Sequence, residues 1–171
     1  MKKQGVARDI SFCMSENKIT FITAEAHHQD LLGALAFRSK ASWGYSRSFL
    51  EQCKSELNVP QNCLEGRLVQ MGYYNQELMG FYSFAHKKGA EPDLNFLFLE
   101  PRFKGQGLGR ALFEDAVQTA IGYGWISFII CSDPHANNFY LHMGAIPIGE
   151  LDSLSCPGHT LPILRYILPD I

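Results

Sequence analysis

The spacing of apolar residues predicts two helices after a first strand. Ile19–Thr23 is rich in β-branched residues and predicts that strand. Apolar residues at helical spacing follow and predict a helix that ends near Ser42. Residues 48–51 match a capping box and predict a second helix that ends at residues 58–60. Residues 1–17 are polar and aperiodic, so we expect a loose N-terminal extension there.

The middle of the chain predicts three successive strands. Residues 67–74, Glu77–Ala85 and Asp93–Leu99 are rich in aromatic and β-branched side chains. Short turns at residues 75–76 and 87–89 join them. Connections this short favour antiparallel pairing.

The last third predicts a crossover followed by a second strand–helix unit. An apolar stripe from Leu108 predicts a helix that ends at Gly122 and Gly124. Residues 126–131 are almost all apolar, as in a strand buried on both faces. A strand, a helix and a second buried strand form a crossover, so this strand should run parallel to Asp93–Leu99.

The remaining elements complete one mixed sheet. Asp133 followed by Pro134 predicts the start of a short helix that ends near His142. Residues 145–149 and 161–168 predict the final strands. We therefore expect an α+β, three-layer fold: a mixed, mostly antiparallel sheet of six to seven strands with helices on both faces. We also expect residues 1–171 to form a single domain.

Composition changes this picture little but excludes several classes of protein. The 171 residues are 46% apolar and 19% charged, as in ordinary soluble globular proteins. A formal net charge of −2 gives no field that would attract nucleic acid or an anionic membrane. Five cysteines without a C-x-x-C pair do not suggest a disulfide framework or a zinc site, and the scattered histidines suggest no metal. We expect a cytoplasmic protein.

A glycine-rich turn between a predicted strand and helix carries the clearest chemical signal. Pro101 ends the strand, and Lys104-Gly105-Gln106-Gly107-Leu108-Gly109-Arg110 leads into the helix. Free amide groups and the positive end of a helix dipole meet at such a point and suit a phosphate or diphosphate. The P-loop pattern and the dinucleotide pattern G-x-G-x-x-G both fail here. The sequence therefore predicts an anion site of another type.

Lys104 to Gly109 resembles the R/Q-x-x-G-x-G/A motif of the GNAT acetyltransferase superfamily, with Lys in the first position. Residues 136–145 are similar to the superfamily's A-x-x-F-Y-x-x-x-G-F segment. Asp93-Leu94 stands where the family often has Glu-Leu, and residues 42–45 resemble a segment between its first two helices. The matched features cover nearly the whole chain, from about residue 19 to residue 168.

The resemblance implies a GNAT-like sheet that splays apart between its fourth and fifth strands, with acetyl-coenzyme A in the gap. The backbone of the fourth strand would pair with the pantetheine arm, and the amides of the glycine turn would hold the diphosphate. Either Asn137 or Asn138 would bind the pantetheine. The cofactor-binding residues so implied are Leu97, Phe98, Leu99, Lys104, Gly105, Gln106, Gly107, Leu108, Gly109, Arg110, Asn137, Asn138 and Tyr140.

Transfer to an amine requires a base and an acid. An amine of pKa about 10.4 is a nucleophile in only about one molecule in 10³ at pH 7. Asp93 is the candidate base, directly or through a water, and its alternative is a solvated residue at a strand entrance. Glu100 is the other nearby carboxylate, and strand alternation predicts that it faces the opposite side of the sheet. Tyr140 is the candidate acid for the leaving thiolate, and its alternative is aromatic packing.

The resemblance to the family implies that Trp43 and Tyr45 form one wall of the acceptor site. Their alternative role is a hydrophobic corner that packs two helices together. The acceptor expected from the resemblance is a small-molecule or peptide amine, and the family's frequent homodimers make a homodimer compatible with it.

Three functions follow from these signals. The first is an enzyme that transfers acetyl from acetyl-coenzyme A to a primary amine by direct attack in a ternary complex. The second is a non-catalytic acyl-coenzyme A binding or sensing domain of the same fold. The third is a nucleotide-binding module of another class, which the failed phosphate motifs disfavour.

Overall fold

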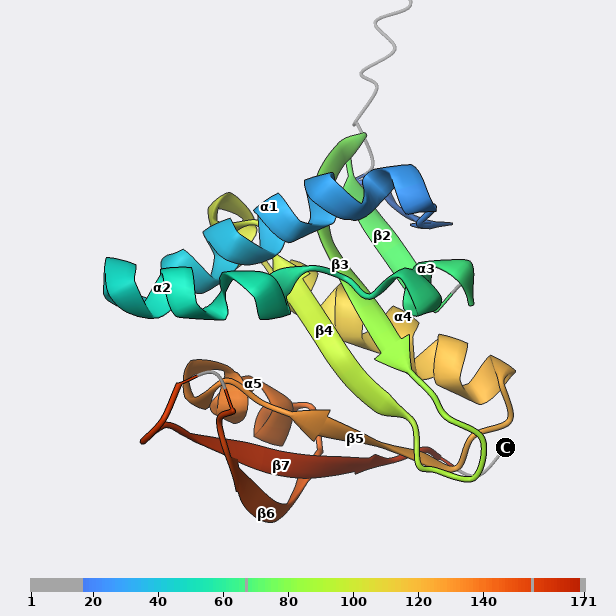
Figure 1. Cartoon of the computed structure of the whole chain (residues 1–171). Coiled ribbons are helices and arrows are strands. Elements are labelled where there is room, and N and C mark those ends of the chain that lie inside the picture. The colour runs from blue at the N-terminus through green and yellow to red at the C-terminus, as the bar shows by residue number, and fades with distance from the viewer. Residues whose placement is uncertain (1–16, 67, 155, 170–171) are drawn as a thin grey trace, which may run out of the picture.

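A computed structural model describes residues 17–66, 68–154 and 156–169. Within them, seven strands form one mixed sheet in the order β1-β2-β3-β4-β5-β7-β6 (Figure 1). The strands are β1 (Ile19–Thr23), β2 (Val69–Tyr74), β3 (Glu77–Ala85), β4 (Asp93–Leu99), β5 (Ser127–Cys131), β6 (Ile146–Asp152) and β7 (Thr160–Ile167). This architecture confirms the predicted fold class.

Five α-helices and four short 3-10 helices surround the described sheet. The helices are α1 (Gln29–Ala41), α2 (Arg47–Cys53), α3 (Gln61–Glu65), α4 (Leu108–Gly122) and α5 (Asn137–His142), with η1 (Ala26–His28), η2 (Lys54–Leu57), η3 (Pro101–Phe103) and η4 (Pro134–Ala136) between them. None of the described helices is both long and apolar enough to span a bilayer.

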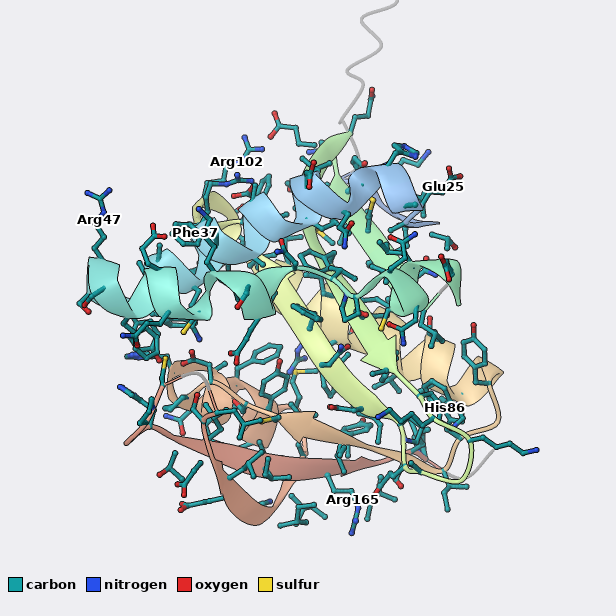
Figure 2. All side chains as sticks on the ribbon, viewed as in Figure 1. Glu25, Phe37, Arg47, His86, Arg102 and Arg165 are labelled. Atoms are coloured by element: carbon teal, nitrogen blue, oxygen red, sulfur yellow. The ribbon has the colours of Figure 1, made fainter. Side chains whose placement is uncertain are left out.

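The helices cover opposite faces of the sheet, and a separate apolar core lies under each set (Figure 1). On one face, α1 and α3 pack on β2, β3 and β4 through residues such as Leu35, Phe81 and Phe96. On the other, the apolar stripe of α4 packs on β3 and β5, with Phe113 and Phe128 fully buried. Side chains fill the space between helices and sheet (Figure 2). Each fully buried side chain of this size contributes about 1.5–3 kcal/mol.

Strands β1 to β4 pair antiparallel with their neighbours, and for β2, β3 and β4 this pairing is as predicted. Asn75 and Gln76 both have positive φ, the geometry of a two-residue hairpin turn. Gly89 takes a φ of 81° in the turn between β3 and β4. These short turns fix the order of β2, β3 and β4.

The sheet opens between β4 and β5. These strands run parallel, as the crossover through α4 predicts, and among the described residues they pair at one position, Asp93 with Ile129. Beyond it they diverge, so the edge of β4 at Leu97 to Leu99 has no strand partner on the β5 side (Figure 1). The predicted splay between the fourth and fifth strands is confirmed.

Local boundaries differ from the predictions near α2. The N-cap is Ser46, not Ser48, because Ser46 has an extended backbone and its Oγ accepts a hydrogen bond from the Phe49 amide at 3.3 Å. The predicted second helix breaks after Cys53 into η2, and α3 was not predicted. The N-terminal extension predicted at residues 1–17 falls almost wholly outside the described residues. Arg67, at the start of the second predicted strand, also lies outside them.

Candidate active site

The glycine turn after β4 exposes backbone amides at the start of α4. Gly105 and Gly107 have φ values of 76° and 79°, and a Cβ atom at either would meet no described atom within 4 Å. Gly107 is the N-cap of α4 and supplies no side chain to cap it. The first amides of a helix have no partner within the helix. The turn therefore offers unshielded N–H donors to an anion.

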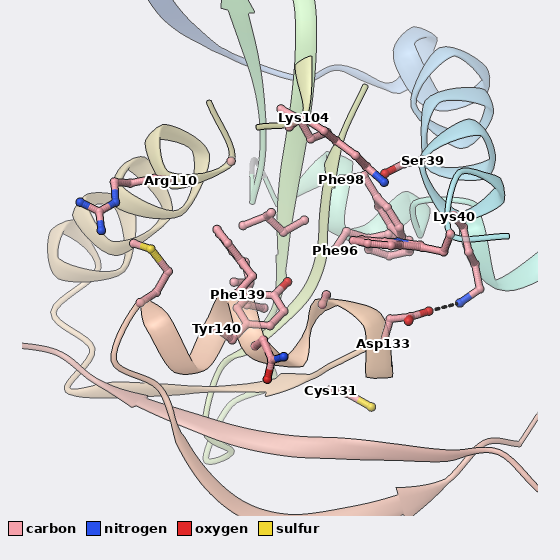
Figure 3. A pocket seen from close by; sticks show the side chains of 18 of the residues that line it. Ser39, Lys40, Phe96, Phe98, Lys104, Arg110, Cys131, Asp133, Phe139 and Tyr140 are labelled. Atoms are coloured by element: carbon pink, nitrogen blue, oxygen red, sulfur yellow. Dashed lines mark hydrogen bonds and ion pairs between the residues drawn. The ribbon is translucent and has the colours of Figure 1, made fainter. Parts of the chain in front are cut away.

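A cavity of about 740 Å³ begins at this turn and runs beside the open edge of β4 (Figure 3). Its walls come from the end of α1, from β4, from the glycine turn and from α5. The volume falls within the usual range for a small-molecule site. It holds most of the residues that the sequence singled out, namely Trp43, Leu97, Phe98, Leu99, Lys104, Gly105, Gly107, Gly109, Arg110, Asn138 and Tyr140.

Five of the singled-out residues lie outside this lining. Gln106 turns back to donate from Nε2 to the carbonyl of Arg102 at 2.9 Å, and Leu108 is buried in the core under α4. Asn137, Tyr45 and Asp93 are not among the lining residues either. Of the two asparagines, Asn138 is the one that lines the cavity.

The side chain of Lys104 crosses to the wall formed by α1. Its Nζ donates to Ser42 Oγ and lies 3.7 Å from the centroid of the Trp43 ring. Burial lowers the pKa of this ammonium group. The charge expected beside the diphosphate thus lies against an aromatic side chain of the opposite wall.

Tyr140 lies in the floor of the cavity, on α5 (Figure 3). The side chain is buried against Phe113 and Phe139, with ring centroids 6.0 and 5.1 Å away. Burial raises the pKa of its hydroxyl, and the carboxylates of Asp133 and Asp93 raise it further. Tyr140 is therefore protonated at neutral pH and can donate a proton or a hydrogen bond.

Asp93 is a buried carboxyl at the point where β4 and β5 meet. Its Oδ1 has no hydrogen-bond partner among the described residues, and burial raises its pKa to about 6. It lies close enough to Cys63 of α3 to raise the pKa of that thiol, although burial is the larger cause. A carboxyl of this kind can exchange a proton near neutral pH.

A bulge overturns the predicted orientation of Glu100. Ser83 pairs with Phe96 and Phe84 with Leu94, so Asn95 is an extra residue in β4. Leu94 consequently packs under α4 while Phe96 packs under α1 and α3. The bulge reverses the alternation, so Glu100 and Asp93 lie on the same side of the sheet. Glu100 forms an ion pair with Arg38 of α1 there.

The segment around Trp43 is fastened to the turn between β5 and α5. The Trp43 ring stacks on His135 with centroids 5.3 Å apart and planes at 8°. Tyr45 donates from its hydroxyl to Asp133 Oδ1 at 2.9 Å, and Lys40 forms an ion pair with Asp133 Oδ2 at 2.9 Å. Trp43 lines the cavity, whereas Tyr45 braces the wall from outside.

Sequence reasoning missed Lys40, Asp133 and Glu56 as residues of this site. All three line the cavity. Asp133 was predicted only as a helix cap, and its place after a strand bordering the splay was the signal that could have identified it. Its carboxylate does cap η4, since Oδ1 accepts from the His135 amide at 2.9 Å. Glu56 lies on the unpredicted η2, and no local pattern marks it.

Comparison with known proteins places this architecture in a family. Residues 39–151 match the family model described as the acetyltransferase (GNAT) domain. A comparison with curated proteins finds no significant match.

Solved structures share the fold at low sequence identity. The GCN5-related N-acetyltransferase from Rhodopseudomonas palustris aligns at a TM-score of 0.68 and 16% identity, covering 91% of this chain and 98% of its own. The PaiA N-acetyltransferase from Thermoplasma acidophilum, solved with coenzyme A, aligns at 0.67 and 16% identity, covering 88% and 99%. The ribosomal-protein-S18-alanine N-acetyltransferase from Escherichia coli aligns at 0.64 and 16% identity, covering 90% and 96%. Since the family model spans well over half of the chain, this protein belongs to the GNAT acetyltransferase family.

Proposed function

We propose that residues 1–171 form one N-acetyltransferase domain that moves acetyl from acetyl-coenzyme A to a primary amine by direct attack in a ternary complex. The observation that carries the proposal is the single cavity that joins the open glycine turn to Tyr140 along the unpaired edge of β4. Such a path suits a long cofactor with an anionic end and a reactive thioester end. It also leaves one wall, at Trp43, for an acceptor.

The residues present fit acetyl-coenzyme A. The amides from Gly105 to Arg110 would hold the diphosphate, because Gly105 and Gly107 leave this stretch unshielded. The Lys104 amide already donates to the carbonyl of Pro101 at 3.2 Å. The backbone groups of Leu97 to Leu99 that face the splay would pair with the amides of the pantetheine arm. Asn138 is better placed than Asn137 to bind that arm, since it lines the cavity.

Asp93 would accept the proton of the incoming ammonium through a water. It does not line the cavity, but its neighbour Asn95 does, and its Oδ1 has no partner among the described residues. A pKa of about 6 leaves the carboxylate ionised at pH 7 while keeping it basic enough to take a proton. A general base of this kind contributes about 10²–10⁴ in rate.

Tyr140 would donate its proton, or a strong hydrogen bond, to the departing thiolate of coenzyme A. The amine nitrogen forms a bond to the acetyl carbonyl carbon, and the carbon–sulfur bond breaks. The sulfur takes a proton from Tyr140, and the second proton, which the nitrogen loses after the attack, returns through solvent to the tyrosinate. The ammonium proton taken earlier by Asp93 is the one released to solvent. The buried, protonated hydroxyl supports this role.

The test is release of coenzyme A thiol from acetyl-coenzyme A across a panel of polyamines, amino acids, aminoglycosides and peptides. Acceptor-dependent thiol release supports the proposal, together with a mass gain of one acetyl group on the acceptor. Thermal stabilisation by acetyl-coenzyme A without release from any amine would instead indicate the binding or sensing domain. Stabilisation by ATP or NAD but not by coenzyme A would contradict both.

A further inference from the structure

Lys104 occupies the first position of the motif that precedes the glycine turn, yet its side chain leaves that turn. Figure 3 shows it extending toward Ser39 on α1, while Arg110 lies on the other side of the cavity. Its ammonium donates to Ser42 Oγ and sits over the Trp43 ring at 3.7 Å. Both of these contacts, within the part of the chain that the structure describes, are with the wall at the end of α1.

Trp43 contacts both turns that flank the cavity. It meets Lys104 from the turn after β4 and His135 from the turn after β5. The second contact is reinforced because Asp133, next to that turn, holds Lys40 and Tyr45. The first contact is a cation over the indole face, supplied by Lys104, and the ion pair of Arg38 with Glu100 is a second link between α1 and the end of β4. Removing the Lys104 ammonium would remove this cation–π contact and leave the stacking on His135 in place.

We propose that Lys104 is a positioning residue of the acceptor site: its side chain holds Trp43 in place as a wall and is not a ligand of the cofactor diphosphate. This inference rests on the proposed function, which assigns the glycine turn to the cofactor and the wall at Trp43 to the acceptor. The diphosphate has other donors, namely the unshielded amides at Gly105 and Gly107 and the guanidinium of Arg110. A cation over an indole face is stabilised by the ring quadrupole, and a partly desolvated position strengthens it.

The experiment uses the full chain with Trp125→Phe, which leaves Trp43 as the sole tryptophan because the sequence has two. In this background we compare Lys104→Met, Lys104→Arg and a control, Lys87→Met, in the turn between β3 and β4. Tryptophan emission and acrylamide quenching are measured without ligand, and coenzyme A binding is measured by calorimetry.

The proposal predicts that Lys104→Met shifts the Trp43 emission and raises its quenching. It also predicts a dissociation constant for coenzyme A within about threefold of the background protein. Lys104→Arg should restore the emission, and Lys87→Met should change neither quantity. A larger loss of affinity in Lys104→Met overturns the proposal, because a lost charge-assisted contact to the diphosphate costs about tenfold or more. Emission identical to that of the control overturns it as well.

The experiment distinguishes failure of this proposal from failure of the proposed function. Failure of the unsubstituted chain to bind coenzyme A would contradict the acetyltransferase proposal. The Trp43 emission would still report whether Lys104 holds the wall.

Discussion

Lys40 and Asp133, 93 positions apart in the chain, form a 2.9 Å ion pair that joins the end of α1 to the turn after β5. The side chains are only 15% and 18% exposed. Burial opposes ionisation of Asp133, but hydrogen bonds from Lys40, the His135 amide and Tyr45 hold its pKa below the usual range. The pair therefore fixes one wall of the cavity to the other across the splay.

Replacing Asp133 with Ala should lower the free energy of unfolding by about 2–4 kcal/mol. The substitution leaves the Lys40 ammonium without its partner in a mostly buried position and removes a helix cap. Urea unfolding followed by circular dichroism measures the loss. Glu77→Ala is the matched control, because its pair with Arg102 is more than half exposed on both sides and should be worth about 0–1 kcal/mol. Equal losses in the two variants would show that the Lys40–Asp133 pair does not fasten the wall.

Asp93 should make the protein less stable as pH rises. Burial raises its folded-state pKa to about 6, against an unfolded value near 3.9. Between these values the folded state keeps a proton that the unfolded state releases, so the free energy of unfolding falls as pH rises through this window. At pH 7 the penalty is about 2–3 kcal/mol at 1.36 kcal/mol per pKa unit.

From pH 4 to pH 7, the free energy of unfolding of Asp93→Asn should therefore rise by about 2 kcal/mol relative to that of wild type. Denaturant titrations of both proteins at the two pH values measure this difference. The same change in both proteins would mean that Asp93 is not buried as an isolated carboxyl. If Asp93 is also the base, the same variant should lose about 10²-fold or more in turnover.

Tyr140→Phe should lower turnover by more than about tenfold and leave coenzyme A affinity near that of wild type. The hydroxyl is the only group removed, and the ring keeps its packing on Phe113 and Phe139. Steady-state rates with an accepted amine, set beside calorimetric affinities, separate the two effects. Unchanged turnover would leave Tyr140 as a packing residue.

Gly107→Ala should weaken coenzyme A binding as well as stability. Its φ of 79° costs a non-glycine residue about 1 kcal/mol, and the new methyl group would lie at the open amides. Gly89→Ala is the matched control, with a φ of 81° and equally open surroundings in a distant turn. Both variants should melt lower, but only Gly107→Ala should bind coenzyme A less tightly. Equal affinities of the two variants for coenzyme A would mean that the glycine turn does not bind the cofactor.

Much of the fold was predictable because local signals agreed with the tertiary arrangement. Pro101 and the glycines mark the end of β4 and the start of α4, and the apolar run at residues 126–131 marks a buried strand. The region from Ser46 to Glu65 was less predictable. There Ser48 resembles an N-cap in sequence although Ser46 is the actual one. The break of the predicted helix into α2 and η2, and the formation of α3, depend on packing against α1 and β3.

The candidate site, too, was predictable only in part. Its backbone features, such as the open turn, could be predicted from the glycines. The direction of the Lys104 side chain and the pairing of Lys40 with Asp133 depend on residues far away in sequence. The bulge at Asn95 has no signature in a run of apolar residues, so the alternation rule assigned Glu100 to the wrong face.

The proposed function requires that the turn after Pro101 holds a diphosphate and directs a thioester into the splay between β4 and β5. A crystal structure of the protein with coenzyme A tests it most directly. We expect the diphosphate on the amides from Gly105 to Arg110 and the pantetheine arm along Leu97 to Leu99. Coenzyme A bound elsewhere, or β4 and β5 paired along their whole length, would contradict it.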